Sequence, residues 1–385
     1  IKKYKRMKII YPICLVFLLN LTLFTAQGQN DKAPTYYLHS LADTSAQSSY
    51  KEYVNFWIDF LYEENDSIRR VYWESSQIGR FGDDYALFYN SLFQYPPKLL
   101  LNYYQPYILS IYFERDTCHI VTAFWNFNFR PNDTTSIQNS NPFAILEIGI
   151  VKKDNNFYLI NLFDKRVQNW EKVRYGKIIY FIEPSLTQIQ LEMEEAKNFV
   201  DTMLAIFSTG IDTITYVVCK TPQSLGYLLG FNFFYAGFTT GKTFINAKII
   251  ISGRGSFNYP HELTHIVVDP FLKPGHFLSE GMATFFGGSS NKTYQQLIKE
   301  FKNKYYPITK TTFDKINEKP NSLDAYISAA LVVNIIYDSY GVEGLQKLNN
   351  SPKEANKCLK HLSAIFNANE NQLFELINSI LDKVR

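Results

Sequence analysis

The sequence predicts an α+β protein of two domains, and three features of the chain support this class. Its 385 residues suffice for two domains of ordinary size. The first half changes from a stretch of helical period to a series of aromatic and β-branched runs that are typical of strands. The second half alternates strand-like and helical segments and then becomes helical to its end. We therefore expect an N-terminal domain of helices and antiparallel sheet over residues 48–172, followed by a second domain over residues 173–385.

The first part of the chain has the pattern of a secretory signal peptide. Residues 1–28 contain no acidic residue, and their five basic residues all lie within the first eight positions. An apolar run follows as far as Phe24, and then the small-residue segment Ala26-Gln27-Gly28. Met7 is the expected translation start. Because the apolar run is short for a bilayer span, we expect cleavage rather than a retained anchor. The mature protein should then be secreted or lie in the periplasm or cell envelope, with a flexible polar lead-in over residues 29–47.

Charge and cysteine content restrict what the mature chain can do. The whole chain carries +3, and the five positive charges of the signal segment leave −2 for the rest. A nearly neutral protein offers no general electrostatic attraction for nucleic acid. Three cysteines remain after the signal segment, namely Cys118, Cys219 and Cys358. Their number is odd, they form no C-x-x-C pair, and the first two lie in apolar runs, so we expect buried free thiols.

The N-terminal domain is expected to begin with an amphipathic helix over residues 48–64. Its apolar face would comprise Tyr50, Val54, Trp57, Ile58 and Leu61. A second helical stretch is expected over residues 84–93. Four strands should follow, over residues 107–114, 118–129, 143–152 and 157–163. His119 alternates with apolar neighbours and is expected in the core or on a sheet face. This order of elements is similar to an NTF2-like cone, an analogy of fold that implies no chemistry.

The second domain is expected to open with strands and helices in alternation. The strands are expected over residues 177–182, 213–219 and 243–252, and the helices over residues 185–208 and from Pro222 onward. Everything after Gly288 should be helical, over residues 292–305, 324–340 and 370–384. Gly341 is the expected C-cap of the middle helix of these three.

Residues 259–288 carry the candidate chemistry. His261-Glu262-Leu263-Thr264-His265 places two histidines four residues apart, so both lie on one face of a helix and can converge on one Zn²⁺. Glu262 stands beside the first histidine, where its carboxylate can take a proton from water. Pro260 suits the first position of this helix, and we expect Pro270 to end it just after Asp269.

A zinc site that keeps an open position needs a third protein ligand, and Glu280 is the candidate. We expect Ser279 to cap a second helix that begins there. Gly281-Met282-Ala283 should let that helix pack closely on the first.

These two segments, H-E-x-x-H and Phe277-Leu278-Ser279-Glu280-Gly281-Met282-Ala283, resemble those of the gluzincin metallopeptidases, the superfamily of thermolysin-like and aminopeptidase-like enzymes. The resemblance covers roughly residues 175–350 and implies a lobe with a mixed sheet followed by a helical lobe. It also implies that His261, His265 and Glu280 hold one Zn²⁺ per chain, with Glu262 as general base. The spacing from His265 to Glu280 is shorter than in those two families and is closer to that of peptidase MA-like relatives.

The same resemblance implies further roles. A tyrosine or histidine would stabilise the oxyanion; Tyr326 is the first candidate and His276 the second. Asp269 either orients a ligand histidine or is a plain helix-end residue. Residues 241–247 would be the edge strand that holds substrate backbone. No G-x-M-E-N-like element is present, which favours an endopeptidase.

The sequence thus predicts a secreted zinc metallopeptidase that acts on peptides or proteins, without a nucleic-acid partner and without a membrane span after signal cleavage. The alternative is a catalytically inactive metal-binding scaffold whose N-terminal domain binds a partner or a glycan. The presence of Glu262 argues against that alternative, because a scaffold needs no base.

Overall fold

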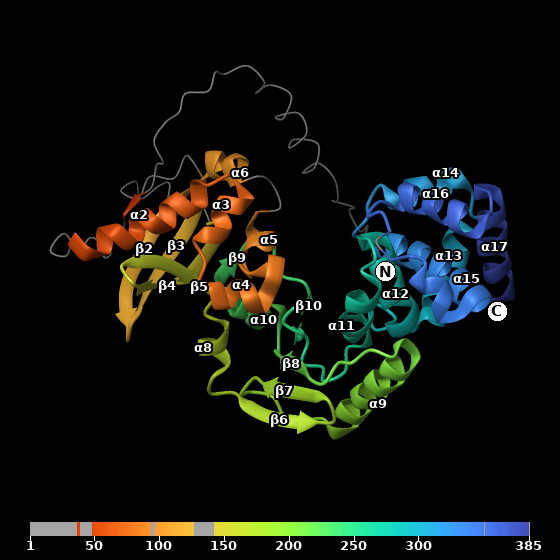
Figure 1. The fold of residues 1–385 in the computed structure, drawn as a ribbon, viewed down its shortest axis with the longest axis horizontal. Coiled ribbons are helices and arrows are strands. Elements are labelled where there is room, and N and C mark those ends of the chain that lie inside the picture. Colours follow the sequence, from red (N-terminus) through yellow and green to blue (C-terminus); the bar gives the residue numbers. More distant parts are fainter. Residues whose placement is uncertain (1–36, 39–47, 94–96, 127–141, 350, 385) are drawn as a thin grey trace, which may run out of the picture. The chain divides into compact units, whose positions relative to one another are not determined.

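The computed structural model describes residues 37–38, 48–93, 97–126, 142–349 and 351–384 (Figure 1). The expected signal peptide, most of the lead-in and the end of the expected strand over residues 118–129 lie outside the described residues. Over the described residues the α+β class predicted from the sequence is confirmed.

The first sheet has six strands in the order β1-β2-β3-β4-β5, with β9 also paired to β4. All four strands expected in this region are confirmed, as β2 (Tyr104–Glu114), β3 (Thr117–Asn126), β4 (Ala144–Lys153) and β5 (Asn156–Ile160). They pair antiparallel in sequence order. Two further strands were not predicted. One is β1 (Tyr37–Leu38), parallel to β2, and the other is β9 (Phe231–Phe234), which comes from the second half of the chain.

Helix α2 (Ser48–Tyr62) packs against this sheet and confirms the expected helix. Trp57 is fully buried, and its indole N–H donates to the Thr122 hydroxyl of β3 at 2.9 Å. The helix expected over residues 84–93 is wrong. A 3₁₀ turn over Gly82–Asp84 ends where that helix was expected to begin, and only the one-turn helix α5 (Tyr89–Leu92) lies within the region. Phe88, just before α5, packs by ring contacts with Trp57, Phe60 and Trp73. Four short helices were not predicted: α3 (Asp66–Val71), α4 (Ser75–Phe81), α6 (Pro97–Tyr103) and α8 (Phe163–Val167).

The second sheet has the order β10-β11-β8-β7-β6 and is mixed. Its strands are β6 (Glu171–Tyr175), β7 (Ile178–Ile182), β8 (Ile214–Val218), β10 (Gly241–Phe244) and β11 (Ile249–Ser252). The pairs β7–β8 and β8–β11 are parallel, whereas β6–β7 and β10–β11 are antiparallel. The prediction of one continuous strand over residues 243–252 is wrong. The chain turns back after Phe244, with Lys248 in the left-handed region at φ 52°, and β10 becomes the edge of the sheet.

Both faces of strand β8, in the middle of this second sheet, are buried. Tyr216 and Val218 of β8 join the hydrophobic cluster formed with the helices of the second half. Val217 and Cys219, which point to the opposite face, join the cluster that contains α2 and the first sheet. A strand buried on both sides reads as a continuous apolar run, which is why this region was recognised as strand.

The remaining helices lie close to where the sequence predicts them, with two additions. They are α9 (Gln190–Phe207), α10 (Pro222–Leu228), α11 (Pro260–Leu272), α12 (His276–Gly287), α13 (Tyr294–Tyr305), α14 (Lys310–Asn317), α15 (Leu323–Gln346), α16 (Ala355–Phe366) and α17 (Glu370–Lys383). The additions are α14 and α16. Gly341 has φ 62° and ψ −150°, so helical geometry is interrupted where a C-cap was expected and then resumes.

Helix α15 is the central helix of the second half. By length and composition it would suit a membrane span, yet 61% of its apolar window is buried inside the protein. It contacts α12, α13, α14 and α17, which is the environment of a core helix. The three cysteines are also buried and free, as predicted.

Candidate metal centre

Helix α11 positions two of the three candidate ligands. It begins at Pro260, as expected, but it continues through Pro270 to Leu272, so the predicted end at Asp269 is wrong. A proline in the last turn removes one donor without preventing the turn from closing, and the N–H of Lys273 donates to the Asp269 carbonyl at 2.7 Å. Ten of the thirteen residues of α11 are buried, which holds the helix rigidly between the second sheet and the helical core.

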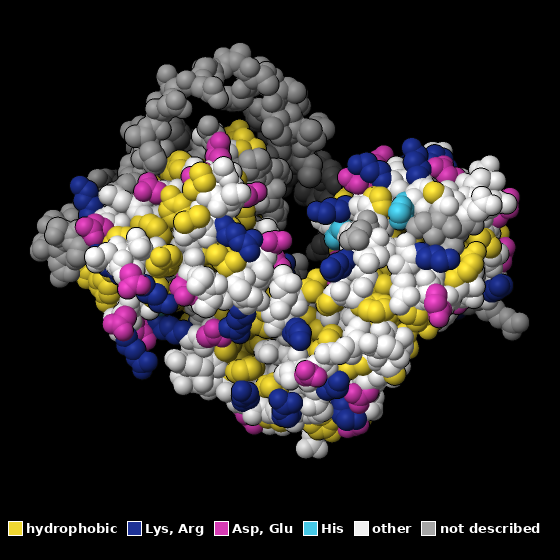
Figure 2. Space-filling model, in the orientation of Figure 1, with side chains coloured by type: hydrophobic (Ala, Val, Ile, Leu, Met, Phe, Trp, Pro, Cys, Tyr) yellow, Lys and Arg dark blue, Asp and Glu magenta, His cyan; other side chains and the backbone are white. Residues whose placement is uncertain are grey.

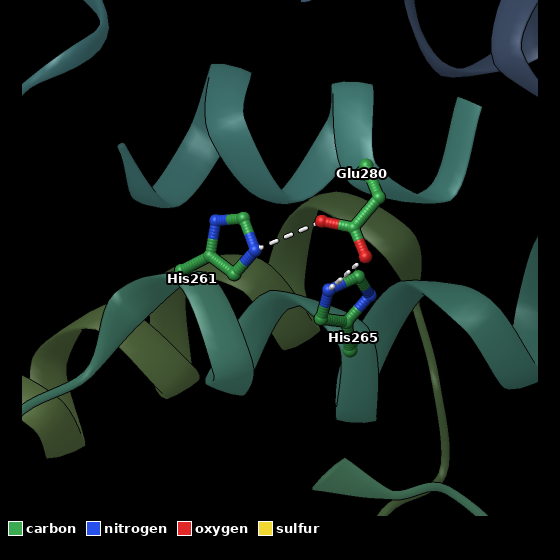
Figure 3. Close-up of side chains that lie close together, drawn as sticks. All are labelled: His261, His265 and Glu280. Atoms are coloured by element: carbon green, nitrogen blue, oxygen red, sulfur yellow. Dashed lines mark hydrogen bonds and ion pairs between the residues drawn. The ribbon is translucent and has the colours of Figure 1, made fainter. Parts of the chain in front are cut away.

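The side chains of His261, His265 and Glu280 converge (Figure 3). Nε2 of His261 lies 3.2 Å from one carboxylate oxygen of Glu280, and Nε2 of His265 lies 3.8 Å from the other. One ligand atom from each residue lies within 4.8 Å of the others. Ligand atoms about 2 Å from a tetrahedral metal would be roughly 3.3 Å apart. The three side chains therefore lie close enough together to hold one metal ion.

Helix α12 brings Glu280 to the histidines in a different way from the one expected. It begins at His276 with Gly275 as N-cap, so Ser279 is not the cap. Gly281 faces α15 rather than α11: a Cβ there would lie 2.8 Å from the backbone carbon of Ala329. The close approach to α11 occurs at Gly287, where a Cβ would lie 2.4 Å from the carbonyl carbon of Pro260.

Each ligand histidine is held through its other ring nitrogen. Nδ1 of His261 contacts the carbonyl oxygen of Gly288 at 2.8 Å, and Nδ1 of His265 contacts Oδ2 of Asp269 at 3.0 Å. Such partners fix the ring and leave Nε2 free to bind a metal. Of the two roles considered for Asp269, the structure shows the one in which it orients a histidine. Ser279 supports it, because its hydroxyl donates to Asp269 Oδ2 at 2.7 Å.

The electrostatics of this cluster favour a bound cation. Burial acts to lower the pKa of His265, but the carboxylates of Asp269 and Glu280 outweigh burial and raise that pKa to about 10. Burial acts to raise the pKa of Glu280, but the hydrogen bond with His261 and the charge of His265 lower it overall. The carboxylates of Asp269, Glu280 and Glu262 around His265 thus give this cluster a negative potential that a metal ion would neutralise.

Glu262 lies next to the ligands and is fixed by strand β10. Its Oε2 accepts a 2.5 Å hydrogen bond from the hydroxyl of Thr243. Gly241 passes so close that a Cβ there would lie 2.5 Å from Glu262 Oε1 and 2.5 Å from a ring carbon of Tyr259. Nothing in the sequence identified Thr243, because its role depends on the register of an edge strand against a helix.

The two candidates for an oxyanion donor lie in different surroundings. Tyr326, in the first turn of α15, lines the same cleft as the ligands, and its ring centre lies 6.3 Å from that of His261 in a stacked arrangement. Burial and the charges of Glu280 and Glu262 raise the pKa of Tyr326. His276 has a side chain that is 43% exposed, and its Nε2 contacts Oδ1 of Asn321 at 3.0 Å.

All of these groups except His276 line one open cleft of about 740 Å³. Strand β10 and the segment before it form part of its wall, and residues 289–291 form another part. Its lining also includes Arg254 and Tyr259, which the sequence had not singled out. Elsewhere, Figure 2 shows basic and acidic side chains interspersed over the visible face, as expected for a chain of small net charge.

No protein-family model matches this chain, and a search of curated proteins likewise found no match. What the fold and the site define is an α+β protein in which a His₂Glu group, able to hold a metal, lies in an open cleft beside a further glutamate.

Proposed function

We propose that this protein is a zinc metallopeptidase of the gluzincin type. The single observation that carries the proposal is the convergence of His261, His265 and Glu280 in an open cleft, with Glu262 directly beside them. Two imidazoles and one carboxylate are donors that suit Zn²⁺ and leave a fourth position for water or substrate. Bound there, the metal would act as a Lewis acid and lower the pKa of a water molecule to roughly 7.

Glu262 would carry the proton in this reaction. Its carboxylate would accept a proton from the attacking water and later deliver it to the leaving amine. The hydroxyl of Thr243 donates to Oε2 and so fixes the orientation of the carboxylate. Gly241 leaves the space in which Oε1 lies. These contacts support a positioned base rather than a residue kept for packing.

Tyr326 would donate a hydrogen bond to the oxyanion that develops on the substrate carbonyl. Its place in the cleft supports this role. A tyrosine phenol ordinarily has a pKa of about 10, so this group is protonated, and therefore a donor, throughout the neutral range.

Strand β10 would hold the substrate backbone. It ends the strand order of the second sheet, and both Gly241 and Thr243 of this strand line the cleft. An extended peptide could add to this edge through main-chain hydrogen bonds.

The mixed sheet with this edge strand, followed by helices, also supports the lobes expected of a gluzincin. The helix-covered first sheet supports an NTF2-like interpretation of the N-terminal half. Export from the cytoplasm rests on the pattern of residues 1–28 alone.

The proposal is tested by the isosteric change Glu262→Gln. The amide cannot accept a proton, and loss of a general base costs about 10²–10⁴-fold in rate. Because the same group would also return the proton, turnover of a degenerate peptide library should fall by the upper end of that range. Zinc content should be unchanged, because Glu262 is not one of the proposed ligands.

The matched control is Glu300→Gln, a glutamate on α13 whose side chain is 56% exposed and which pairs with Lys292. It should leave turnover unchanged. Chelator-resistant cleavage, or cleavage by Glu262→Gln at the wild-type rate, would contradict the proposal. Metal binding without any cleavage by the wild type would favour the scaffold alternative.

A further inference from the structure

The cleft contains a guanidinium group that the proposed reaction does not use. Arg254 lies in the turn between β11 and α11, and its guanidinium carbon is 3.7 Å from the ring centre of Tyr259. Its Nη1 donates to Oδ1 of Asn291, a neutral partner. Its buried Nε has no hydrogen-bond partner, and no acid within the described residues forms an ion pair with this guanidinium.

One turn and one aromatic ring hold the guanidinium in place. Asn291 and Ser290 both have left-handed backbones, at φ 61° and 51°. They form a two-residue turn closed by paired backbone hydrogen bonds between Ser289 and Lys292, at 3.0 and 2.9 Å. Asparagine is among the few residues that tolerate this conformation. The stack on Tyr259 restrains the other side of the group, so the cation is preorganised in the wall of the cleft.

The guanidinium is also close to the candidate metal centre. The ring centre of Tyr259 lies 6.4 Å from that of His261. Because 3.7 Å separates Arg254 from the same tyrosine ring, the guanidinium carbon lies at most about 10 Å from the histidine ring centre. An extended peptide advances about 3.3 Å per residue. The guanidinium is therefore close enough to contact any of about the first three substrate residues on one side of a peptide bond held at the metal.

We infer that Arg254 is a specificity residue that binds a carboxylate of the peptide substrate within about three residues of the cleaved bond. That carboxylate is either an aspartate or glutamate side chain or the free C-terminus. The inference rests on the proposed function for its substrate class. Because Nη1 donates to Asn291 and Nε is buried, Nη2 is the nitrogen left to donate to a carboxylate, and such charge-assisted hydrogen bonds are stronger than neutral ones.

A second cation lines the cleft but has a partner elsewhere. Lys242 alternates along β10 with Gly241 and Thr243, so its side chain leaves the strand on the opposite face from Glu262. Its ammonium lies 5.6 Å from the ring centre of Phe244. Burial raises the pKa of Asp84, and the positive charge of Lys242 opposes this increase. Lys242 thus provides a matched control, because its loss removes one positive charge from the same part of the chain but from the face of β10 that points away from Glu262.

The test measures binding rather than turnover, so that it does not depend on whether the protein hydrolyses peptides. Zinc-loaded Glu262→Gln protein would be titrated against fluorescent hexapeptide pools by anisotropy. One pair of pools differs by Asp/Glu against Asn/Gln, and a second pair by a free against an amidated C-terminus. We expect one of these exchanges to weaken binding roughly 10- to 100-fold. The pair that shows the difference identifies the source of the carboxylate.

Adding Arg254→Gln should abolish this difference, whereas adding Lys242→Gln should leave it in place. Arg254→Lys keeps the charge without the planar fork and should retain part of the preference, which separates recognition from loss of fold. Thermal unfolding of each variant checks the fold directly. Equal binding of carboxylate and amide pools, a preference that survives Arg254→Gln, or no binding of any pool would overturn the inference. Absence of hydrolysis by the wild type alongside an Arg254-dependent preference would overturn only the proposed reaction.

Discussion

The hydroxyl of Thr243 donates a 2.5 Å hydrogen bond to the carboxylate of Glu262. These residues lie on different elements, one on the edge strand β10 and the other on the first turn of α11. The contact therefore ties the position of the proposed base to the strand that would hold the substrate. A disturbance of either residue should affect the reaction more than the fold.

Replacing Thr243 by valine tests this link, because the shape is kept and the donor is lost. A hydrogen bond to a charged group contributes about 1.5–3 kcal/mol, so we expect kcat to fall roughly 10-fold or more. Zinc content, measured by metal analysis, should stay at the wild-type level. Thr239→Val removes a neighbouring hydroxyl that donates to the Gly241 carbonyl and should have a smaller effect. Equal effects of the two changes would argue against a specific role for Thr243.

Gly241→Ala should displace the proposed base without removing the metal. The new methyl group would lie 2.5 Å from Glu262 Oε1, so the carboxylate must move. Misplacement by about 1 Å can cost about 10²-fold in rate, and we expect a loss of that order in kcat/KM. Gly79→Ala in α4 is the control, since nothing lies within 4 Å of a Cβ there, and it should be neutral or slightly stabilising. Wild-type activity in Gly241→Ala would contradict the assigned position of Glu262.

Alanine at His261, His265 or Glu280 should each remove tightly bound zinc. Two remaining ligands do not complete a site, and about one zinc per chain in the wild type should fall to near zero by metal analysis. The unfolding temperature should also decrease, because a metal bound only by the folded state stabilises it. His276→Ala is the matched control and should retain zinc. Full zinc content in Glu280→Ala would remove that residue from the site.

The three thiols should be unreactive until the protein unfolds. Burial raises the pKa of Cys118 and Cys358 to about 12 and also raises that of Cys219. The thiolate is the reactive form, so almost none is present at pH 8. A thiol reagent such as DTNB should titrate close to zero groups in the native mature protein and three in denaturant. Rapid reaction of one thiol in the native state would show that its site opens.

The candidate ligands and most long elements could be predicted from the sequence because their signals are local. The four-residue spacing of His261 and His265 places both on one face of a helix, and the amphipathic periodicity of the sequence predicts helix α2. The features that were missed depend on contacts between distant segments. Ser279 contacts Asp269 rather than capping a helix, Gly281 meets α15 rather than α11, and Arg254 acquires its place from a turn 37 residues later in the chain.

Strand β8 and the residue after it belong to two hydrophobic clusters at once, one through Tyr216 and Val218 and the other through Val217 and Cys219. The helix that carries the histidines packs in the first cluster, and Trp57 of α2 packs in the second. Strand β11 is shared in the same way, with Ile250 in the first cluster and Ile249 and Ile251 in the second, so a change in free energy in one cluster is transmitted to the other through these strands. Metal binding should slow amide hydrogen exchange in the first sheet as well as around α11, and the two halves should unfold as one cooperative unit.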